Sequence, residues 1–244
     1  MLVARKGLGS SESFHKMLRR ARPAAAITGT FFGLRNRLPT GDLVVNGRHI
    51  FRGFVGTAVA ITEGNVVSFI ETRYKGPKMD WSMFETVIRG GPWLVKAGKV
   101  AVAPRHEGFR SLSIAGKRRR TAVALTADNH LLFIATRQKV SLWDFAKAVH
   151  ELGAYHAVAL DGGTSTALYF AGRHIANPGR GLTNVLLLYH RRDRYEESRR
   201  QFAGSRALPQ LRKRTALPEV AGKLPLPKSA GGFDPALGLD FPTR

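Results

Sequence analysis

Residues 154–189, AYHAVALDGGTSTALYFAGRHIANPGRGLTNVLLLY, decide how the rest of the chain is interpreted. An apolar segment, residues 156–160, runs directly into a single acid, Asp161. We expect this segment to be a buried strand that fixes the carboxylate in space. Gly162 and Gly163 follow, and because glycine lacks a Cβ they permit a tight turn and a close approach of a ligand to the backbone.

Three small hydroxyl residues, Thr164, Ser165 and Thr166, come directly after the glycines. Hydroxyl groups and bare backbone N–H groups can hydrogen-bond an anion or a sugar. Asp-Gly is also a common way to build a turn, and for this motif alone the turn is the simpler interpretation. The choice between a turn and a ligand site therefore depends on the other segments of the chain.

The chain is strongly basic, with a formal net charge of +22 over 244 residues. Such a charge attracts polyanions, whether nucleic acid, anionic lipid headgroups or phosphorylated glycans, and does not choose among them. The basic residues are scattered, with one tight run at residues 117–120, KRRR. No helix-turn-helix pattern, zinc-finger spacing or aromatic RNA-binding signature accompanies them, so we expect no specific nucleic-acid partner. A general solubility charge explains the excess equally well.

Several classes of protein are disfavoured by what the sequence lacks. It has no cysteine, which rules out disulfides and thiolate chemistry. No apolar run approaches the length of a membrane span, and residues 1–22 lack the apolar core of a signal peptide. The eight histidines show no zinc-ligand spacing, so the sequence predicts no metal and no other cofactor. No pattern indicates an oligomeric state.

Strand–turn–strand units dominate the predicted secondary structure, with about three helices among them. This composition predicts an α+β fold with a largely antiparallel or mixed sheet. The expected helices are residues 10–21, capped by Ser10 or Ser11, residues 79–89, and residues 142–152, capped by Ser141. The expected hairpins are 42–45 with 48–51, 57–61 with 66–70, 93–95 with 99–103, 121–126 with 131–136, and 167–170 with 174–176. Residues 24–32 and 183–189 are expected to be further strands.

The composition divides the chain into three predicted parts. Residues 1–22 form a helical lead-in, residues 23–189 form one domain, and residues 190–244 form a basic tail. The tail is rich in Arg, Pro, Gly and Ala and holds half of the 12 prolines. Its first part, residues 191–201, is expected to be a charged helix, and the rest lacks a period that would pack a core.

Four segments in a fixed order carry a resemblance to a known family. They are residues 27–32, ITGTFF; residues 91–96, GPWLVK; residues 120–123, RTAV; and residues 160–166, LDGGTST, followed by Asn177-Pro178, Arg180 and Asn184. This ordered set resembles the phosphodiester glycosidase family, which includes the enzyme that uncovers mannose 6-phosphate. Many bacterial members are described as exopolysaccharide-related. The sequence departs from the family pattern at Thr28, where the family has Asn, and at Thr164 and Thr166, which replace Gly and Ser.

The resemblance implies a hydrolase that cleaves a sugar-1-phosphodiester at its anomeric carbon, with a phosphorylated or anionic glycan as substrate. It implies catalytic roles for Asp161, as the carboxylate, and Arg120, as a clamp on the phosphate. The implied substrate-binding residues are Thr28, Gly29, Phe32, Gly91, Thr121, Gly162, Gly163, Thr164, Ser165, Asn177 and Arg180. Family members usually work outside the cytoplasm, whereas residues 1–22 show no export signal.

Two other functions fit the same residues. The first is a non-catalytic module that binds anionic polysaccharide through the same cleft and the basic surface. The second is a basic protein associated with nucleic acid, whose affinity would depend steeply on salt. A nucleophilic Ser165 is disfavoured, because the local sequence is not Gly-x-Ser-x-Gly and no His and acid are placed to complete a triad.

Overall fold

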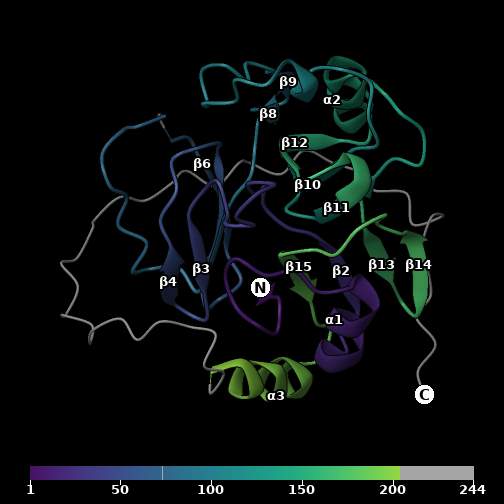
Figure 1. Cartoon of the computed structure of the whole chain (residues 1–244). Helices are drawn as coiled ribbons and strands as arrows, with labels where there is room; N and C mark the ends of the chain where they lie inside the picture. Colours follow the sequence, from purple (N-terminus) through teal and green to yellow (C-terminus); the bar gives the residue numbers. More distant parts are fainter. Residues whose placement is uncertain (73, 204–244) are drawn as a thin grey trace. The chain divides into compact units, whose positions relative to one another are not determined.

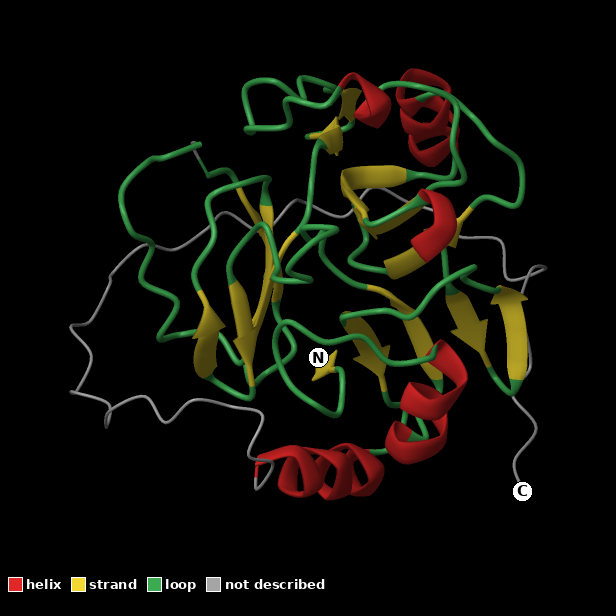
Figure 2. Ribbon diagram, viewed as in Figure 1, coloured by secondary structure: helices red, strands yellow, loops and turns green. Residues whose placement is uncertain are grey.

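The computed structural model describes residues 1–72 and 74–203, and this part of the chain has the predicted α+β architecture. It contains three α-helices and three antiparallel sheets of five strands each (Figures 1 and 2). No helix in the described part is long and apolar enough to cross a membrane. The Pro-rich remainder of the predicted tail, residues 204–244, lies outside the described residues.

Each sheet combines strands from distant parts of the sequence. The first has the order β1 (Leu2–Val3), β15 (Asn184–Leu188), β2 (Ala25–Thr28), β13 (Leu168–Phe170) and β14 (Arg173–Ala176). The second has the order β11 (Leu131–Ala135), β10 (Thr121–Thr126), β12 (Ala154–Leu160), β8 (Trp93–Lys96) and β9 (Lys99–Val100). The third has the order β4 (Arg48–Phe51), β3 (Leu43–Val45), β7 (Thr86–Arg89), β5 (Ala58–Ile61) and β6 (Val67–Ile70).

One central hydrophobic core joins the three sheets. Ile27 of β2, Val158 of β12 and Ile88 of β7 all belong to it, and each is fully buried. Because side chains alternate across a strand, the neighbours of these residues point to the other face of their sheet. Each sheet therefore needs a second cover of its own.

Two helices and one loop supply these covers. Helix α1 (Phe14–Ala21) packs Met17 onto the first sheet, and α2 (Leu142–Glu151) packs Phe145 onto the second. Trp81 lies against Val87 on the outer face of the third sheet. The loop that carries Trp81 thus takes the place of a helix.

This arrangement explains why the helix predicted for residues 79–89 is wrong. Asp80 accepts a hydrogen bond from the Ser82 backbone N–H at 2.9 Å, a local turn that competes with helix formation. The second half of the segment is β7, where Val87 and Ile88 are buried on opposite faces of the sheet. A strand covered on both faces lacks the alternation of polar and apolar positions, so its sequence is hard to distinguish from a helix segment.

The other predicted helices are present, with shifts at their ends. Helix α1 begins four residues after the predicted start, because Ser13 rather than Ser10 or Ser11 caps it, accepting from the Lys16 N–H. Ser141 caps α2 as predicted. The charged segment predicted after residue 190 forms α3 (Arg192–Ala203).

The five predicted hairpins are all present, and most differ from prediction only at their ends. The predicted strand 24–32 is shorter, because β2 ends at Thr28 and the chain turns away at Gly29. The edge strand β1 was not predicted, since two residues give no detectable period. The end of β2 is important because Gly29 is hydrogen-bonded to Asp161, the residue that follows β12.

Candidate active site

Asp161 lies where the first and second sheets meet. It follows the last residue of β12, and its backbone N–H donates to the Gly29 carbonyl just beyond β2 at 3.0 Å. Thr121, the first residue of β10, donates its hydroxyl to the Asp161 carbonyl at 2.7 Å. The backbone of Asp161 is therefore held by hydrogen bonds from both sides. The sequence analysis expected such a strand to fix the carboxylate in space.

The Asp161 carboxyl group forms a closed set of contacts with Arg180 and Ser165. Arg180 Nη2 lies 3.3 Å from Asp161 Oδ2, and Arg180 Nε donates to Ser165 Oγ at 2.7 Å. The Ser165 hydroxyl in turn donates to the Asp161 carboxylate. Ser165 is fully buried, so this hydroxyl aligns the acid and the guanidinium rather than meeting solvent.

Burial dominates the electrostatics of Asp161. Loss of hydration raises the pKa of this carboxyl to about 6, although Ser165 and Arg180 act to lower it. The side chain of Asp161 keeps 10% of its exposure and that of Arg180 keeps 32%. An edge of the pair is therefore accessible, and a carboxyl with this pKa changes its charge close to neutral pH.

Phe32 provides one wall beside Arg180. The guanidinium carbon of Arg180 lies 4.5 Å from the centre of the Phe32 ring, a distance at which a cation is attracted to the face of an aromatic ring. Phe31, the preceding residue, packs edge-on against Phe109 at 5.2 Å. Phe32, a predicted site residue, thus lies against the arginine, and Phe31 contacts a loop from a distant part of the chain.

Gly29 permits the closest backbone contact in this region. A Cβ at this position would lie 1.8 Å from Oδ1 of Asn184, which accepts a hydrogen bond from the Thr30 N–H at 2.9 Å. Gly162 is also crowded, since a Cβ there would lie 2.7 Å from the Arg119 carbonyl. Both glycines allow chain segments to approach where any larger residue would separate them.

Gly163 and Thr164 complete the turn after Asp161. Gly163 has φ +61°, which favours glycine. Thr164 is exposed, has no left-handed backbone, and accepts a hydrogen bond from the Gly179 N–H at 2.8 Å. The replacement of the family's third glycine by Thr164 is therefore sterically accommodated.

Gly91 lies at a second place where two backbone segments cross, and it contacts β12 two residues before Asp161. It donates its N–H to the Ala159 carbonyl at 2.8 Å, has φ +95°, and precedes Pro92 through a cis peptide bond. A buried acid that the sequence analysis missed, Glu107, supports this crossing. Its carboxylate accepts from the Trp93 N–H at 2.8 Å and the Thr57 hydroxyl at 2.7 Å, and burial raises its pKa. Glu107 lies in a loop without any motif, so no local signal marked it.

The Arg120 guanidinium, which was predicted to clamp a phosphate, is directed toward backbone carbonyl groups. It donates to the carbonyls of Val140, Ile114 and Gly116. The reason is strand alternation, which places Arg120 on the same face of β10 as Ala122, the face that packs against α2. Burial lowers the pKa of Arg120 to about 10, so it stays a cation at neutral pH, and its role is to hold the segment before α2.

In the described part of the chain, the side chains of Thr28 and Asn177 form no hydrogen bond with Asp161. Thr28 is buried at the end of β2, where its N–H donates to the Ala167 carbonyl. Asn177 is exposed, and its carbonyl accepts from Arg119 Nη1 at 3.2 Å. Of the predicted residues, the structure thus groups Gly29, Phe32, Thr121, Gly162, Ser165 and Arg180 around Asp161. Among the described residues, no group of three or more His, Asp or Glu side chains could hold a metal ion.

Residues 21–189 match the family model described as phosphodiester glycosidase, and the chain belongs to that family. The matched range contains every residue that was predicted for the site. No curated protein matches the sequence.

Three solved structures resemble the fold at low sequence identity. The zebrafish N-acetylglucosamine-1-phosphodiester alpha-N-acetylglucosaminidase catalytic domain, auto-inhibited by its pro-peptide, has a TM-score of 0.65 and 19% identity, over 75% of this chain and 68% of that one. A hypothetical protein from Synechocystis has a TM-score of 0.56 and 17% identity, over 76% and 56% of the two chains. A putative exported protein from Burkholderia pseudomallei K96243 has a TM-score of 0.56 and 15% identity, over 77% and 70%.

Proposed function

We propose that this protein is a hydrolase that cleaves a sugar-1-phosphodiester, or a related anionic glycan linkage, at the anomeric carbon. The observation that carries the proposal is the contact of the Asp161 carboxyl with Arg180 and Ser165, at the point where three predicted motifs meet. Membership of the phosphodiester glycosidase family supports the reaction class. The activity named for the zebrafish relative supports a sugar-phosphodiester substrate.

The leaving group explains why one carboxyl can be sufficient. Cleavage at the anomeric carbon passes through a transition state with oxocarbenium character, and most glycosidases use two carboxyl groups. One of these normally protonates a poor alkoxide leaving group. A phosphate monoester is a stable anion, so it departs without that proton, and the second carboxyl can be replaced by a cation that holds the phosphate.

In the proposed reaction, Asp161 and Arg180 have different roles. The ionised Asp161 stabilises positive charge at the anomeric carbon and accepts a proton from the attacking water. The bond between the anomeric carbon and the phosphate oxygen breaks, and its electron pair leaves with the phosphate. Arg180 binds that phosphate through its guanidinium fork, which matches two phosphate oxygens. The products are the free sugar and a phosphate monoester.

The test is hydrolysis of a panel of aryl and alkyl sugar-1-phosphodiesters by the full chain and by Asp161→Asn. We expect Asp161→Asn to lose at least a hundredfold in kcat/KM while keeping its fold by circular dichroism. Asp128→Asn is the matched control, because Asp128 is exposed and, within the described residues, its side chain contacts Thr126 and His130. Turnover by Asp161→Asn at the rate of the parent would remove Asp161 from the mechanism. Binding of the phosphodiesters without any turnover by the parent would instead assign the protein to the non-catalytic glycan-binding class.

A further inference from the structure

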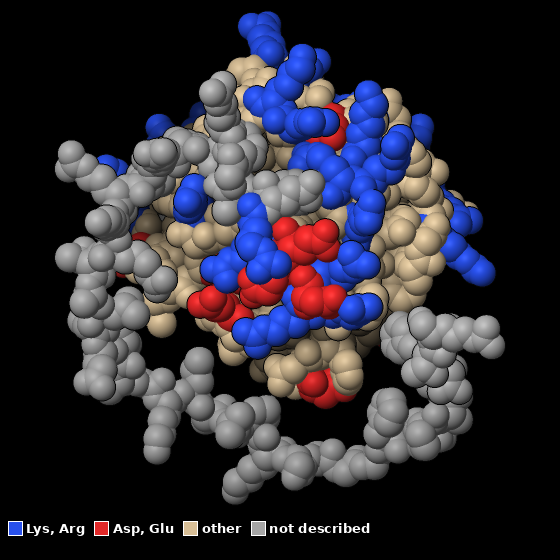
Figure 3. All heavy atoms as spheres, turned by 90° about the horizontal axis from the view of Figure 1, so that it is seen from below, with Lys and Arg blue, Asp and Glu red and all other residues tan. Residues whose placement is uncertain are grey.

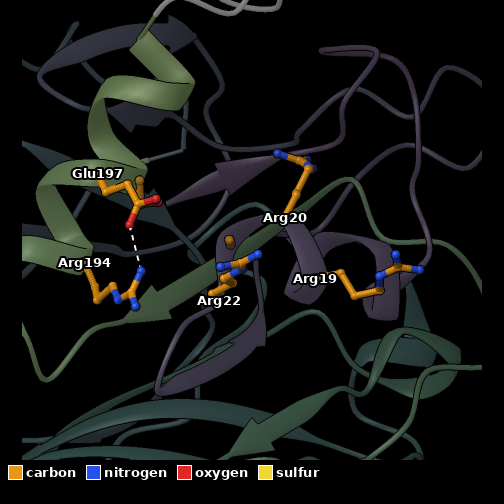
Figure 4. Close-up of a pocket in the computed structure, with 7 residues that line it drawn as sticks. Arg19, Arg20, Arg22, Arg194 and Glu197 are labelled. Carbon is orange, nitrogen blue, oxygen red and sulfur yellow. Dashed lines mark hydrogen bonds and ion pairs between the residues drawn. The ribbon is translucent and has the colours of Figure 1, made fainter.

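A second cation-rich site lies at the opposite end of β2 from Asp161. The last residues of α1 and one side of α3 enclose a cavity of about 240 Å³ (Figure 4). It is lined by Arg19, Arg20, Ala21, Arg22, Arg194, Glu197 and Ser198. Arg22 precedes β2, whereas Gly29, which contacts Asp161, follows it. At about 3.3 Å per residue the strand alone separates the two places by roughly 10 Å or more.

Tyr189 holds the two helices that form the cavity. Its hydroxyl donates to the Ala21 carbonyl at 2.8 Å and is hydrogen-bonded to Ser198 Oγ at 2.7 Å. Ser198 is itself buried, and burial raises the pKa of Tyr189, so this hydroxyl keeps its proton at neutral pH. The end of α1 and the side of α3 are thus joined below the cavity by a fixed contact.

The cations of the cavity are not balanced by the acids around it. Arg20 is bound to Glu12 at 2.6 Å, and Arg194 is bound to Glu197 at 3.0 Å. Within residues 1–72 and 74–203, the side chains of Arg19 and Arg22 have no hydrogen bond or ion pair. Figure 4 shows Arg22 between Arg20 and the Arg194–Glu197 pair, with Arg19 on the far side of α1. Two guanidinium groups therefore keep their donors available.

The position of these arginines at the C-terminal end of a helix does not account for the surplus of positive charge at the cavity. The C-terminus of a helix carries about −0.5 of an elementary charge, which favours nearby cations but cannot neutralise two of them. Arg22 also adopts a left-handed backbone with φ 47°, where glycine is preferred. The protein thus places an arginine at a conformationally costly position facing a cavity. Figure 3, seen from the side of α3, shows Lys and Arg spread over the visible face and Asp and Glu gathered near its middle.

We propose that this cavity binds the phosphoryl group of a small soluble phosphate ester. Guanidinium groups bind phosphate oxygens in pairs, and Arg22 supplies such a fork, while Arg19 also lines the cavity. The volume of the cavity accommodates an organic group beside the phosphate. The site is separate from Asp161, so the proposal does not depend on the proposed glycosidase activity.

The test is titration of the full chain with inorganic phosphate by calorimetry at fixed ionic strength. Arg22→Gln should weaken binding at least tenfold, Arg22→Lys should weaken it less, and the double variant Arg19→Gln/Arg22→Gln should abolish it. The matched control is Arg48→Gln/Arg173→Gln, which removes the same charge at two exposed strand positions and should change the affinity less than twofold. Circular dichroism of each variant checks the fold.

Three results would overturn the proposal. Equal losses in the cavity variants and in Arg48→Gln/Arg173→Gln would mean that phosphate responds to overall charge only. Loss of phosphate binding in Arg180→Gln, with Arg22→Gln unaffected, would place the phosphate beside Asp161. Binding to phosphatidylcholine vesicles containing phosphatidate, without binding of inorganic phosphate, would identify a membrane surface as the ligand.

Discussion

Arg180 Nη2 lies 3.3 Å from Oδ2 of Asp161, and yet the pKa of this carboxyl is raised rather than lowered. An arginine at this distance normally favours the ionised acid. Burial outweighs it here because only 10% of the Asp161 side chain is exposed. The pair is consequently close to a balance between the charged and the neutral acid, and small changes around it should move that balance measurably.

The first prediction concerns the pH dependence of catalysis. If the ionised Asp161 is the active form, kcat/KM should fall tenfold per pH unit below an apparent pKa of about 6. The measurement is the initial rate on an aryl sugar-1-phosphodiester between pH 4 and pH 8. A rate that instead rises as the pH falls through 6 would make the neutral acid the active form, acting as a proton donor.

The second prediction concerns the pH dependence of stability. The pKa of Asp161 is about 6 in the folded protein and 3.8 as an unperturbed group, so the folded state binds this proton more tightly. The free energy of unfolding should therefore decrease as the pH rises from about 4 to about 6, by about 3 kcal/mol for this group. Urea denaturation of the parent and of Asp161→Asn at pH 4 and pH 7 isolates the contribution, since other acids act equally in both. An identical pH dependence in the two proteins would contradict the raised pKa.

The third prediction concerns Arg180. Arg180→Gln removes the cation beside Asp161, so the pKa of Asp161 should increase further and the acidic limb of the rate profile should move to higher pH. It should also raise KM and lower kcat, because the group that holds the phosphate is lost. Arg180→Lys keeps the positive charge but loses the guanidinium fork, so its kcat and KM should lie between those of the parent and of Arg180→Gln. Arg173→Gln, at an exposed strand position, should leave the profile unchanged.

Much of the fold could be predicted because its signals are local. Asn46-Gly47 and Ala171-Gly172 both adopt left-handed backbone at hairpin turns, and each of the flanking strands was found from the sequence. The helix predicted for residues 79–89 was wrong because a strand buried on both faces lacks the alternation of polar and apolar residues. Its strand character comes from pairing with β3 and β5, which no short window of sequence contains.

The candidate site also has features that the sequence indicates and features that only the folded chain shows. Asp161 and Arg180 could be proposed from the sequence because they lie in the ordered motifs that carry the family resemblance. The direction of Arg120 could not, since it depends on carbonyl groups of residues 114, 116 and 140 that only the folded chain brings to it. Glu107 was missed for a similar reason, as its partners Thr57 and Trp93 come from two other segments.

The fourth prediction concerns the contact of Gly29 with Asn184. Gly29→Ala would place a methyl group 1.8 Å from Asn184 Oδ1 and separate β2 from β15, which should cost about 3 kcal/mol of stability. Gly179→Ala is the matched control, because its Cβ would meet Thr164 at 3.9 Å, an ordinary contact. Thermal denaturation should show a clearly lower Tm for the first variant and a nearly unchanged Tm for the second. Equal Tm values would mean that the Gly29 segment can move away without loss.

The last prediction separates the charge of Glu107 from its hydrogen bonds. Burial raises the pKa of this carboxyl, so its ionised form is disfavoured in the folded state and its contribution to stability should decrease as the pH rises through the folded pKa. Glu107→Gln keeps an acceptor for the Trp93 N–H and should remove that pH dependence at little cost. Glu107→Ala leaves buried groups of Trp93 and Thr57 without partners, which should cost about 2 kcal/mol and disturb the Gly91 crossing near Asp161. Urea denaturation and kcat/KM of both variants check this, and equal stability of Glu107→Gln and Glu107→Ala would show that these hydrogen bonds do not support the site.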